Sequence, residues 1–191
     1  MTTTPKIILI PGSSRSGSWN AKLAGTIDQA LAVAGAETTR ISLADYDMPI
    51  YNGDLEQNRG VPADAKKLGH LIAQHHGVVL VCPEYNGSIT PLLKNTIDWL
   101  SRDLGEAKPF ADRVFALTAC SPGALGGLRG LAHMRDVLVA LGADMVTPQL
   151  AVGSANSAFN EDETLANDRH QGMLDKVVDA MIERASFLAR A

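Results

Sequence analysis

Residues 12–20 place small, hydroxyl and cationic side chains in one short stretch, Gly-Ser-Ser-Arg-Ser-Gly-Ser-Trp-Asn. The stretch follows an apolar run at 6–10 and leads into a helical pattern that begins at residue 19. A loop between a strand and a helix N-terminus presents backbone N–H groups to an anion. Hydroxyls and an amide add donors, and Arg15 adds a planar charged fork. This chemistry suits a phosphate, and residues 12–20 are called the phosphate loop below.

The phosphate loop departs from two better-known motifs. Gly12 and Gly17 have the spacing of a P-loop, but Ser18 stands where the phosphate-reaching lysine belongs, so triphosphate hydrolysis is disfavoured. A G-x-G-x-x-G pattern is absent from this stretch, which disfavours a dinucleotide pyrophosphate. A phosphate monoester remains as the predicted ligand; the alternative is a hydroxyl-rich turn with Ser18 as an ordinary helix N-cap. The candidate contacts are Ser13, Arg15, Ser18 and Asn20.

A second loop, Pro-Glu-Tyr-Asn-Gly-Ser-Ile-Thr-Pro at 83–91, follows another apolar run. Its two prolines predict a stiff turn. Such a turn could hydrogen-bond the edge of a flat heterocycle while Tyr85 contacts the ring. It could equally be a rigid strand-to-helix connection in which Asn86-Gly87 forms a turn and Tyr85 packs on the surface. The residues alone leave both interpretations open.

A third loop at 120–129 is rich in glycine, Cys-Ser-Pro-Gly-Ala-Leu-Gly-Gly-Leu-Arg. Glycines let a ligand lie directly against backbone N–H groups. The alternative is a flexible connection at the start of a helix. A phosphate loop and two loops suited to a flat polar ring together describe a mononucleotide site, and flavin mononucleotide (FMN) fits that shape.

Apolar runs and helical patterns alternate along the chain, which predicts a three-layer α/β fold with a five-stranded parallel sheet in a single domain, residues 1–191. Ligands of such sheets bind at the carboxyl ends of the strands, where the strand order reverses. The three loops follow the first, third and fourth predicted strands, so this edge should hold the site. The predicted strands are 6–10, 37–43, 77–82, 113–119 and 145–152, and the predicted helices are 19–34, 62–76, 91–102, 127–141 and 162–189.

Composition narrows the class of protein. The 191 residues are 46% hydrophobic and 20% charged with a net charge of −4, which gives no sign of a nucleic-acid or membrane surface. The N-terminal residues lack signal-peptide features, so we expect a cytoplasmic location. The five histidines form no metal-binding motif, and no metal site is predicted. Cys82 and Cys120 are expected to be small core residues, with a redox pair the less favoured alternative.

Three blocks, at 12–20, 83–88 and 93–102 (Leu-Lys-Asn-Thr-Ile-Asp-Trp-Leu-Ser-Arg), together resemble the NADPH-dependent FMN reductases. That family includes quinone, azo-dye and chromate reductases of flavodoxin-like fold. The resemblance extends from the first strand to Gly126-Gly127. It implies a flavodoxin-like sheet of order 2-1-3-4-5 and a homodimer or homotetramer with FMN near the subunit interface.

By position, the resemblance implies FMN contacts in all three loops. FMN would carry the redox step, taking hydride from NADPH (or NADH) and passing it to a flavin, quinone or other small acceptor by a ping-pong mechanism. No side chain is then required as an acid or base, so no catalytic residue is assigned. The implied phosphate contacts are Ser13, Arg15, Ser18 and Asn20, and the implied ring contacts are Pro83, Glu84, Tyr85, Asn86, Ser121, Gly123, Gly126 and Gly127.

Other segments carry weaker expectations. The block from Lys94 to Arg102 is expected to pack its helix at the subunit interface rather than to perform chemistry, with Asp98 as a cap or ion-pair residue. The stretch 46–54 resembles a family segment that reaches toward a partner subunit's site, but Asn52 and Gly53 replace a more acidic version, so no ligand contact is assigned. In 153–172, Phe159 either covers a substrate pocket or closes a surface loop, and we favour the loop. The alternative functions are a flavodoxin-like electron carrier and a noncatalytic flavin-binding redox sensor.

Overall fold

The structure is a computed structural model that describes residues 3–190. Its centre is a parallel sheet of strands in the order β2-β1-β3-β6-β7. When the two strands of a separate small hairpin are left out of the numbering, this is the predicted flavodoxin-like order 2-1-3-4-5. The strands are β1 (Lys6–Pro11), β2 (Glu37–Arg40), β3 (Gly77–Val81), β6 (Val114–Cys120) and β7 (Asp144–Val152).

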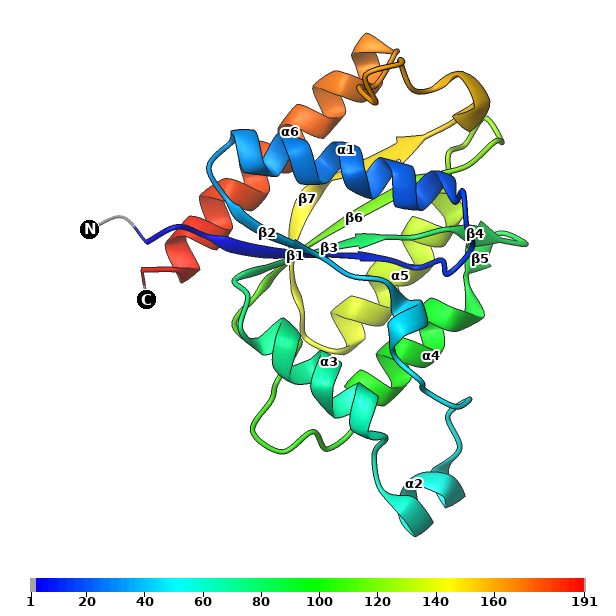
Figure 1. Ribbon diagram of the computed structural model, residues 1–191, viewed down its shortest axis with the longest axis vertical. Helices are drawn as coiled ribbons and strands as arrows, with labels where there is room; N and C mark the ends of the chain where they lie inside the picture. The colour runs from blue at the N-terminus through cyan, green and yellow to red at the C-terminus, as the bar shows by residue number, and fades with distance from the viewer. Residues whose placement is uncertain (1–2, 191) are drawn as a thin grey trace.

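Helices cover both faces of the sheet (Figure 1). α1 (Trp19–Val33) and α6 (Asp168–Leu188) pack on one face, and α3 (Ala63–Ala73), α4 (Pro91–Leu100) and α5 (Leu128–Ala140) pack on the other. Because side chains alternate along a strand, β1 places Ile7 on the first face and Ile8 on the second, both with no exposed surface. Burying each such side chain stabilises the fold by about 1.5–3 kcal/mol.

The second strand is shorter than predicted. We expected 37–43, whereas pairing with β1 ends at Arg40. The reason is local: the Ser42 hydroxyl accepts a hydrogen bond from the Ala44 N–H at 3.3 Å and starts a 3₁₀ turn, η1 (Leu43–Asp45). Leu43, whose apolar side chain suggested a strand, is buried among the residues under α3 as part of this 3₁₀ turn.

The last helix begins six residues later than its apolar pattern suggested, at Asp168. The Asn167 side chain caps it by accepting from the Arg169 N–H at 2.9 Å. Upstream, Phe159 and Leu165 form an isolated antiparallel bridge that closes a loop. The Phe159 ring also stacks on Trp19, with 6.1 Å between centroids. Phe159 therefore takes part in closing this loop, and a role in covering a substrate stays a prediction.

One helix was not predicted, α2 (Gly53–Arg59). Asn52 caps it by accepting from the Asp54 N–H at 2.8 Å, and none of its residues is buried. Figure 1 shows α2 projecting away from the layers. Its sequence lacks the regular spacing of apolar residues by which an amphipathic helix is recognised.

The segment that leads to α2 is tied to α4. The Trp99 indole donates to the Pro49 carbonyl at 2.6 Å, and Asn95 Oδ1 accepts from the Tyr51 N–H at 2.8 Å. These bonds explain why polar atoms are placed on the buried side of the 93–102 block. On the outer side, Lys94 and Asp98 form an i,i+4 ion pair with 2.6 Å between Nζ and Oδ1, which confirms the ion-pair expectation for Asp98.

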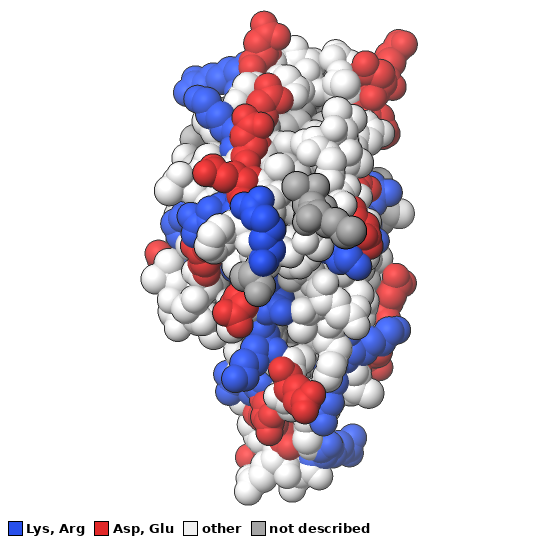
Figure 2. Space-filling view, turned by 90° about the vertical axis from the view of Figure 1, so that its left-hand side faces the viewer, with Lys and Arg blue, Asp and Glu red and all other residues white. Residues whose placement is uncertain are grey.

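Charge is mixed over the side of the molecule from which β1 enters the sheet. Figure 2 shows Lys and Arg side chains interspersed there with Asp and Glu. This face therefore carries no broad surface of a single sign. Among residues 3–190, no helix is long and apolar enough to cross a membrane.

Candidate functional site

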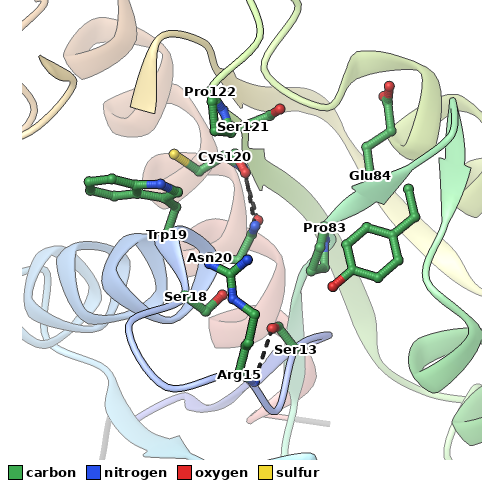
Figure 3. A pocket seen from close by; sticks show the side chains of 11 residues that line it. Ser13, Arg15, Ser18, Trp19, Asn20, Pro83, Glu84, Cys120, Ser121 and Pro122 are labelled. Atoms are coloured by element: carbon green, nitrogen blue, oxygen red, sulfur yellow. Dashed lines mark hydrogen bonds between the residues drawn. The ribbon is translucent and has the colours of Figure 1, made fainter. Parts of the chain in front are cut away.

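A cavity of about 130 Å³ lies where the three predicted loops meet, at the carboxyl ends of β1, β3 and β6 (Figure 3). This is the edge at which the strand order reverses, as expected for a doubly wound sheet. The residues that line it are Ser13, Arg15, Ser18, Trp19, Asn20, Pro83, Glu84, Tyr85, Cys120, Ser121 and Pro122.

The phosphate loop offers donors that the protein itself does not use. In the described part of the chain, the backbone N–H groups of Ser14, Ser16 and Gly17 have no hydrogen-bond acceptor. Ser18 occupies the N-cap position of α1, as the ordinary N-cap interpretation predicts. Its hydroxyl makes no capping bond, so that interpretation gives no role to the side chain. The exposed Arg15 forms no ion pair among residues 3–190. These groups leave the loop able to bind an anion.

Asn20 joins the phosphate loop to the third loop. Its Nδ2 donates to the Cys120 carbonyl at 2.8 Å, and its Oδ1 accepts from the Cys120 N–H at 2.9 Å. The side chain is buried, with 5% of its surface exposed. An amide that makes both bonds fixes the distance between the start of α1 and the end of β6. Its second amino proton stays available to a ligand.

The second loop folds into a hairpin, β4 (Glu84–Tyr85) with β5 (Ser88–Ile89). Asn86 and Gly87 form its two-residue turn with φ of 53° and 78°, the left-handed pair that a tight hairpin requires. Asn-Gly is a strong signal for such a hairpin, so both strands could have been predicted. The turn lies outside the cavity, whereas Tyr85 lines it and remains 51% exposed.

Two further bonds hold the hairpin in place. Glu84 Oε2 accepts from the Gly130 N–H at 3.0 Å, in the first turn of α5, so the carboxylate caps that helix. Thr90 caps α4 and its hydroxyl also donates to the Gly12 carbonyl at 2.9 Å, which links the hairpin to the phosphate loop. With the Asn20 bonds, each loop is tied to another by hydrogen bonds within the protein.

Two glycines of the third loop, Gly126 and Gly127, are required by close packing within the protein. Ser121 lines the cavity, but Gly123, Gly126 and Gly127 do not. Gly126 has φ of +63°, and a Cβ there would lie 2.6 Å from the Val152 carbonyl carbon. Gly127, also left-handed, is the N-cap of α5. Gly126 therefore lets the loop pack tightly on the end of β7, while a Cβ on Gly127 would lie 2.6 Å from the Ala119 Cβ in β6.

The structure thus brings together most of the predicted contacts and adds three residues. Trp19, Cys120 and Pro122 also line the cavity. Each lies within a loop that the sequence singled out, so position alone could have found them. The predicted contacts that line the cavity are Ser13, Arg15, Ser18, Asn20, Pro83, Glu84, Tyr85 and Ser121, and those outside it are Asn86, Gly123, Gly126 and Gly127.

Comparison with known proteins decides the family. Residues 5–157, which include the whole cavity, match the model of the NADPH-dependent FMN reductases. The chain belongs to this family. It is an oxidoreductase whose cofactor is FMN and whose co-substrate is NAD(P)H.

Relatives of this chain match along nearly their full lengths. A quinone reductase of Escherichia coli is 34% identical over 100% of this chain and 98% of its own. An NAD(P)H-dependent FMN reductase of Pseudomonas aeruginosa is 30% identical over 95% of each chain. Among solved structures, the flavoenzyme NAD(P)H:(acceptor) oxidoreductase FerB of Paracoccus denitrificans has a TM-score of 0.80 and 26% identity, covering 96% of this chain and 98% of its own.

The two cysteines of the chain lie on opposite faces of the sheet. Cys82 packs with the residues under α3, α4 and α5, and Cys120 packs with those under α1 and α6. Burial raises the pKa of the Cys120 thiol to about 12 and raises that of Cys82 as well. Their side chains therefore point apart, and both thiols stay protonated at neutral pH.

Proposed function

We propose that residues 1–191 act as one domain that uses FMN in the loop cavity to pass electrons from NAD(P)H to a quinone or another small acceptor. The observation that most supports this proposal is the phosphate loop. Its backbone N–H groups without acceptors, and Arg15, which forms no ion pair among residues 3–190, can donate hydrogen bonds to a phosphate dianion. The names of the relatives from Escherichia coli and Pseudomonas aeruginosa support quinones or flavins as the acceptor class.

In this proposal each loop of the chain contributes one kind of contact. Ser13, Arg15 and Ser18 hold the phosphate, and Tyr85 and Ser121 lie beside the ring. Bound FMN supplies two-electron chemistry with a pyridine nucleotide on one side and an acceptor on the other. The cavity of about 130 Å³ is far below the roughly 300–1,000 Å³ of sites that enclose a ligand. The ring must therefore extend from it with an accessible face.

An accessible face used by one substrate after the other supports a ping-pong cycle. The protein's role is then to bind and orient, since no lining side chain is set up as an acid or base. Glu84 is engaged with Gly130, and burial keeps Cys120 protonated. Arg15 acts through binding, because its guanidinium offers hydrogen-bond donors to a phosphate.

Neither alternative function has an observation in its favour. A thiol-based sensor needs a reactive cysteine or a pair within bonding reach, whereas Cys82 and Cys120 are buried on opposite faces. An electron carrier that docks basic proteins is expected to be strongly acidic, whereas the net charge here is −4.

We also propose a homodimer or homotetramer in the cytoplasm. Tyr85, which lines the cavity, and Leu125 and Leu128 of the third loop are each about half exposed, at 51%, 48% and 49%. Exposed apolar patches mark interaction sites, and a second copy covering them would shield the flavin ring from water. The cytoplasm keeps thiols such as Cys120 reduced. Light scattering coupled to size exclusion tests the oligomer, and a monomeric mass with bound FMN would contradict it.

The test of the function is anaerobic absorbance of the FMN-loaded protein mixed in turn with NADPH, NADH and then 1,4-benzoquinone. Bleaching of the flavin band by a nucleotide and its return with quinone are the expected results. Initial rates with both substrates varied should then give parallel double-reciprocal lines, because the two half-reactions are separate. FMN that stays bound without bleaching would point to a carrier, and intersecting lines would contradict the ping-pong cycle.

A further inference from the structure

A second groove of about 510 Å³ lies on the other side of the phosphate loop. It shares Ser13 and Arg15 with the candidate FMN cavity, so the two are adjacent. Its other wall comes from the segment that follows β2. The lining residues are Pro11, Ser13, Ser14, Arg15, Ser16, Ala21, Arg40, Ile41, Ser42 and Asp45. Its volume is within the roughly 300–1,000 Å³ range of small-molecule sites.

Two guanidinium groups face this groove from different elements. Arg40 is at the carboxyl end of β2, and a Cβ built on Gly25 would lie 2.9 Å from its Nη1, so the head of Arg40 lies against α1. Neither Arg40 nor Arg15 forms an ion pair within residues 3–190. Serine hydroxyls surround them, and Asp45 is the carboxylate of the lining set. In the proposed function the FMN phosphate engages Arg15, so Arg40, with serine hydroxyls beside it, is the guanidinium of this groove left to bind a second phosphate monoester.

We propose that this groove binds the 2′-phosphate of NADPH, with Arg40 as the residue that selects NADPH over NADH. This inference rests on the proposed function, in which the nicotinamide must reach a ring beside Tyr85 and Ser121. A donor with its nicotinamide at that end of the cavity can extend its adenosine past the phosphate loop into the adjacent groove. NADPH and NADH differ by one phosphate monoester, which is the chemistry that Arg40 can recognise.

Asp45 adds to the groove a carboxylate whose effect on phosphate binding is opposite to that of Arg40. Its carboxylate repels a phosphate but can accept a hydrogen bond from the free 2′-hydroxyl of NADH. Arg40 and Asp45 should therefore shift donor preference in opposite directions when neutralised. A site that merely tolerated the adenosine would not show this pair of opposite effects.

The first measurement compares flavin reduction by NADPH and NADH in FMN-loaded wild type, Arg40→Gln and Asp45→Asn. Arg40→Gln should lower kcat/KM for NADPH by about tenfold or more relative to its effect on NADH, because a charge-assisted bond is lost. Asp45→Asn should raise the NADPH/NADH ratio. Arg169→Gln, which removes an exposed charge from the first turn of α6, is the matched control and should leave the ratio unchanged.

The second measurement is calorimetric titration of the same proteins with adenosine 2′,5′-bisphosphate, adenosine 5′-monophosphate and inorganic phosphate. The bisphosphate should bind wild type more tightly than either other probe, and Arg40→Gln should abolish that difference. Equal binding of bisphosphate and inorganic phosphate would overturn the nucleotide assignment. A loss of FMN affinity in Arg40→Gln as large as the loss of NADPH efficiency would place Arg40 in the FMN site and also overturn it.

The two proposals fail in distinguishable ways. Wild type whose flavin is reduced by neither nucleotide would contradict the proposed function. The bisphosphate titration would still show whether the groove binds the 2′-phosphate. Wild type reduced by both nucleotides, with an unchanged ratio in Arg40→Gln, would contradict the groove alone.

Discussion

The side-chain amide of Asn20 forms a two-way hydrogen-bonded pair with the backbone of Cys120, a residue 100 positions away in the chain. The pair spans the gap between the start of α1 and the end of β6. The amide donates to the carbonyl and accepts from the N–H, whereas a carboxylate could only accept. Asn20 therefore contributes to the site first by fixing two loops relative to each other.

Asn20→Asp should destabilise the protein, because a carboxylate cannot donate to the Cys120 carbonyl and would be buried beside it. We expect the free energy of unfolding to fall by about 1–3 kcal/mol and FMN affinity to fall with it. Urea unfolding of the FMN-free protein and a fluorescence titration with FMN measure the two. Asn58→Asp, at an exposed position of α2 away from the three loops, is the matched control. Equal effects of the two substitutions would contradict the role of Asn20.

Arg15→Ala tests the phosphate assignment. The substitution should weaken FMN binding about tenfold or more and change riboflavin binding little, because riboflavin lacks the phosphate. Flavin fluorescence quenching gives both dissociation constants. A variant that lost affinity for the two flavins equally would show that Arg15 contacts the ring or holds the loop.

Glu84 should stabilise the fold through the N-terminus of α5. Glu84→Ala removes the acceptor for the Gly130 N–H and should lower the free energy of unfolding by about 1–2 kcal/mol. Glu84→Gln keeps an acceptor oxygen and should recover most of that loss. Urea midpoints measured at an unchanged m value report the difference. Equal losses in Ala and Gln variants would mean that charge, rather than the capping bond, is what matters.

The thiols should be inert in the native protein. With the pKa of Cys120 raised to about 12, the thiolate fraction at pH 8 is on the order of 10⁻⁴. Alkylation by iodoacetamide, followed by mass spectrometry, should be slow at that pH and should accelerate about tenfold per pH unit, because a thiol ionises as pH rises. Both cysteines should react quickly once urea unfolds the protein. Full labelling of the native protein at pH 7 would restore the sensor hypothesis.

Trp99→Phe should loosen the segment that leads to α2. The substitution removes the indole N–H that donates to the Pro49 carbonyl and keeps an aromatic ring in the core. Hydrogen exchange at the Tyr51 amide should accelerate by about tenfold relative to amides of β3, which report global unfolding. An equal acceleration in both places would mean that the loss is one of core packing alone.

The fold could be predicted from the sequence because its buried strands are continuous apolar runs. Val78, Val79 and Leu80 have helices on both sides, so no polar residue interrupts them. The errors occurred where short-range hydrogen bonds decide the structure. Ser42 ends the second strand and Asn167 delays the last helix, and both act through side-chain caps that apolar periodicity does not register.

The loops of the candidate site could be predicted from residue types, but the contacts that individual residues make could not. Asn20 and Glu84 have the chemistry of ligand contacts, yet each bonds to backbone that is distant in sequence. Gly126 suits close approach by a ligand, yet the close neighbour is the backbone at Val152. Such partners become known only when the loops are assembled in space. The groove beside Arg40 was missed for the same reason.

The bonds between loops also bear on how the protein matures. Asn20 pairs with Cys120, and Thr90 pairs with Gly12, so the cavity has no complete wall until β6 has joined the sheet. A nascent chain that has emerged only as far as β3 has its phosphate loop but lacks the residues that hold it. Cofactor capture must then follow synthesis of the first two-thirds of the chain. FMN would then bind to a nearly complete fold. A shortage of FMN would leave folded protein without its cofactor rather than unfolded chains.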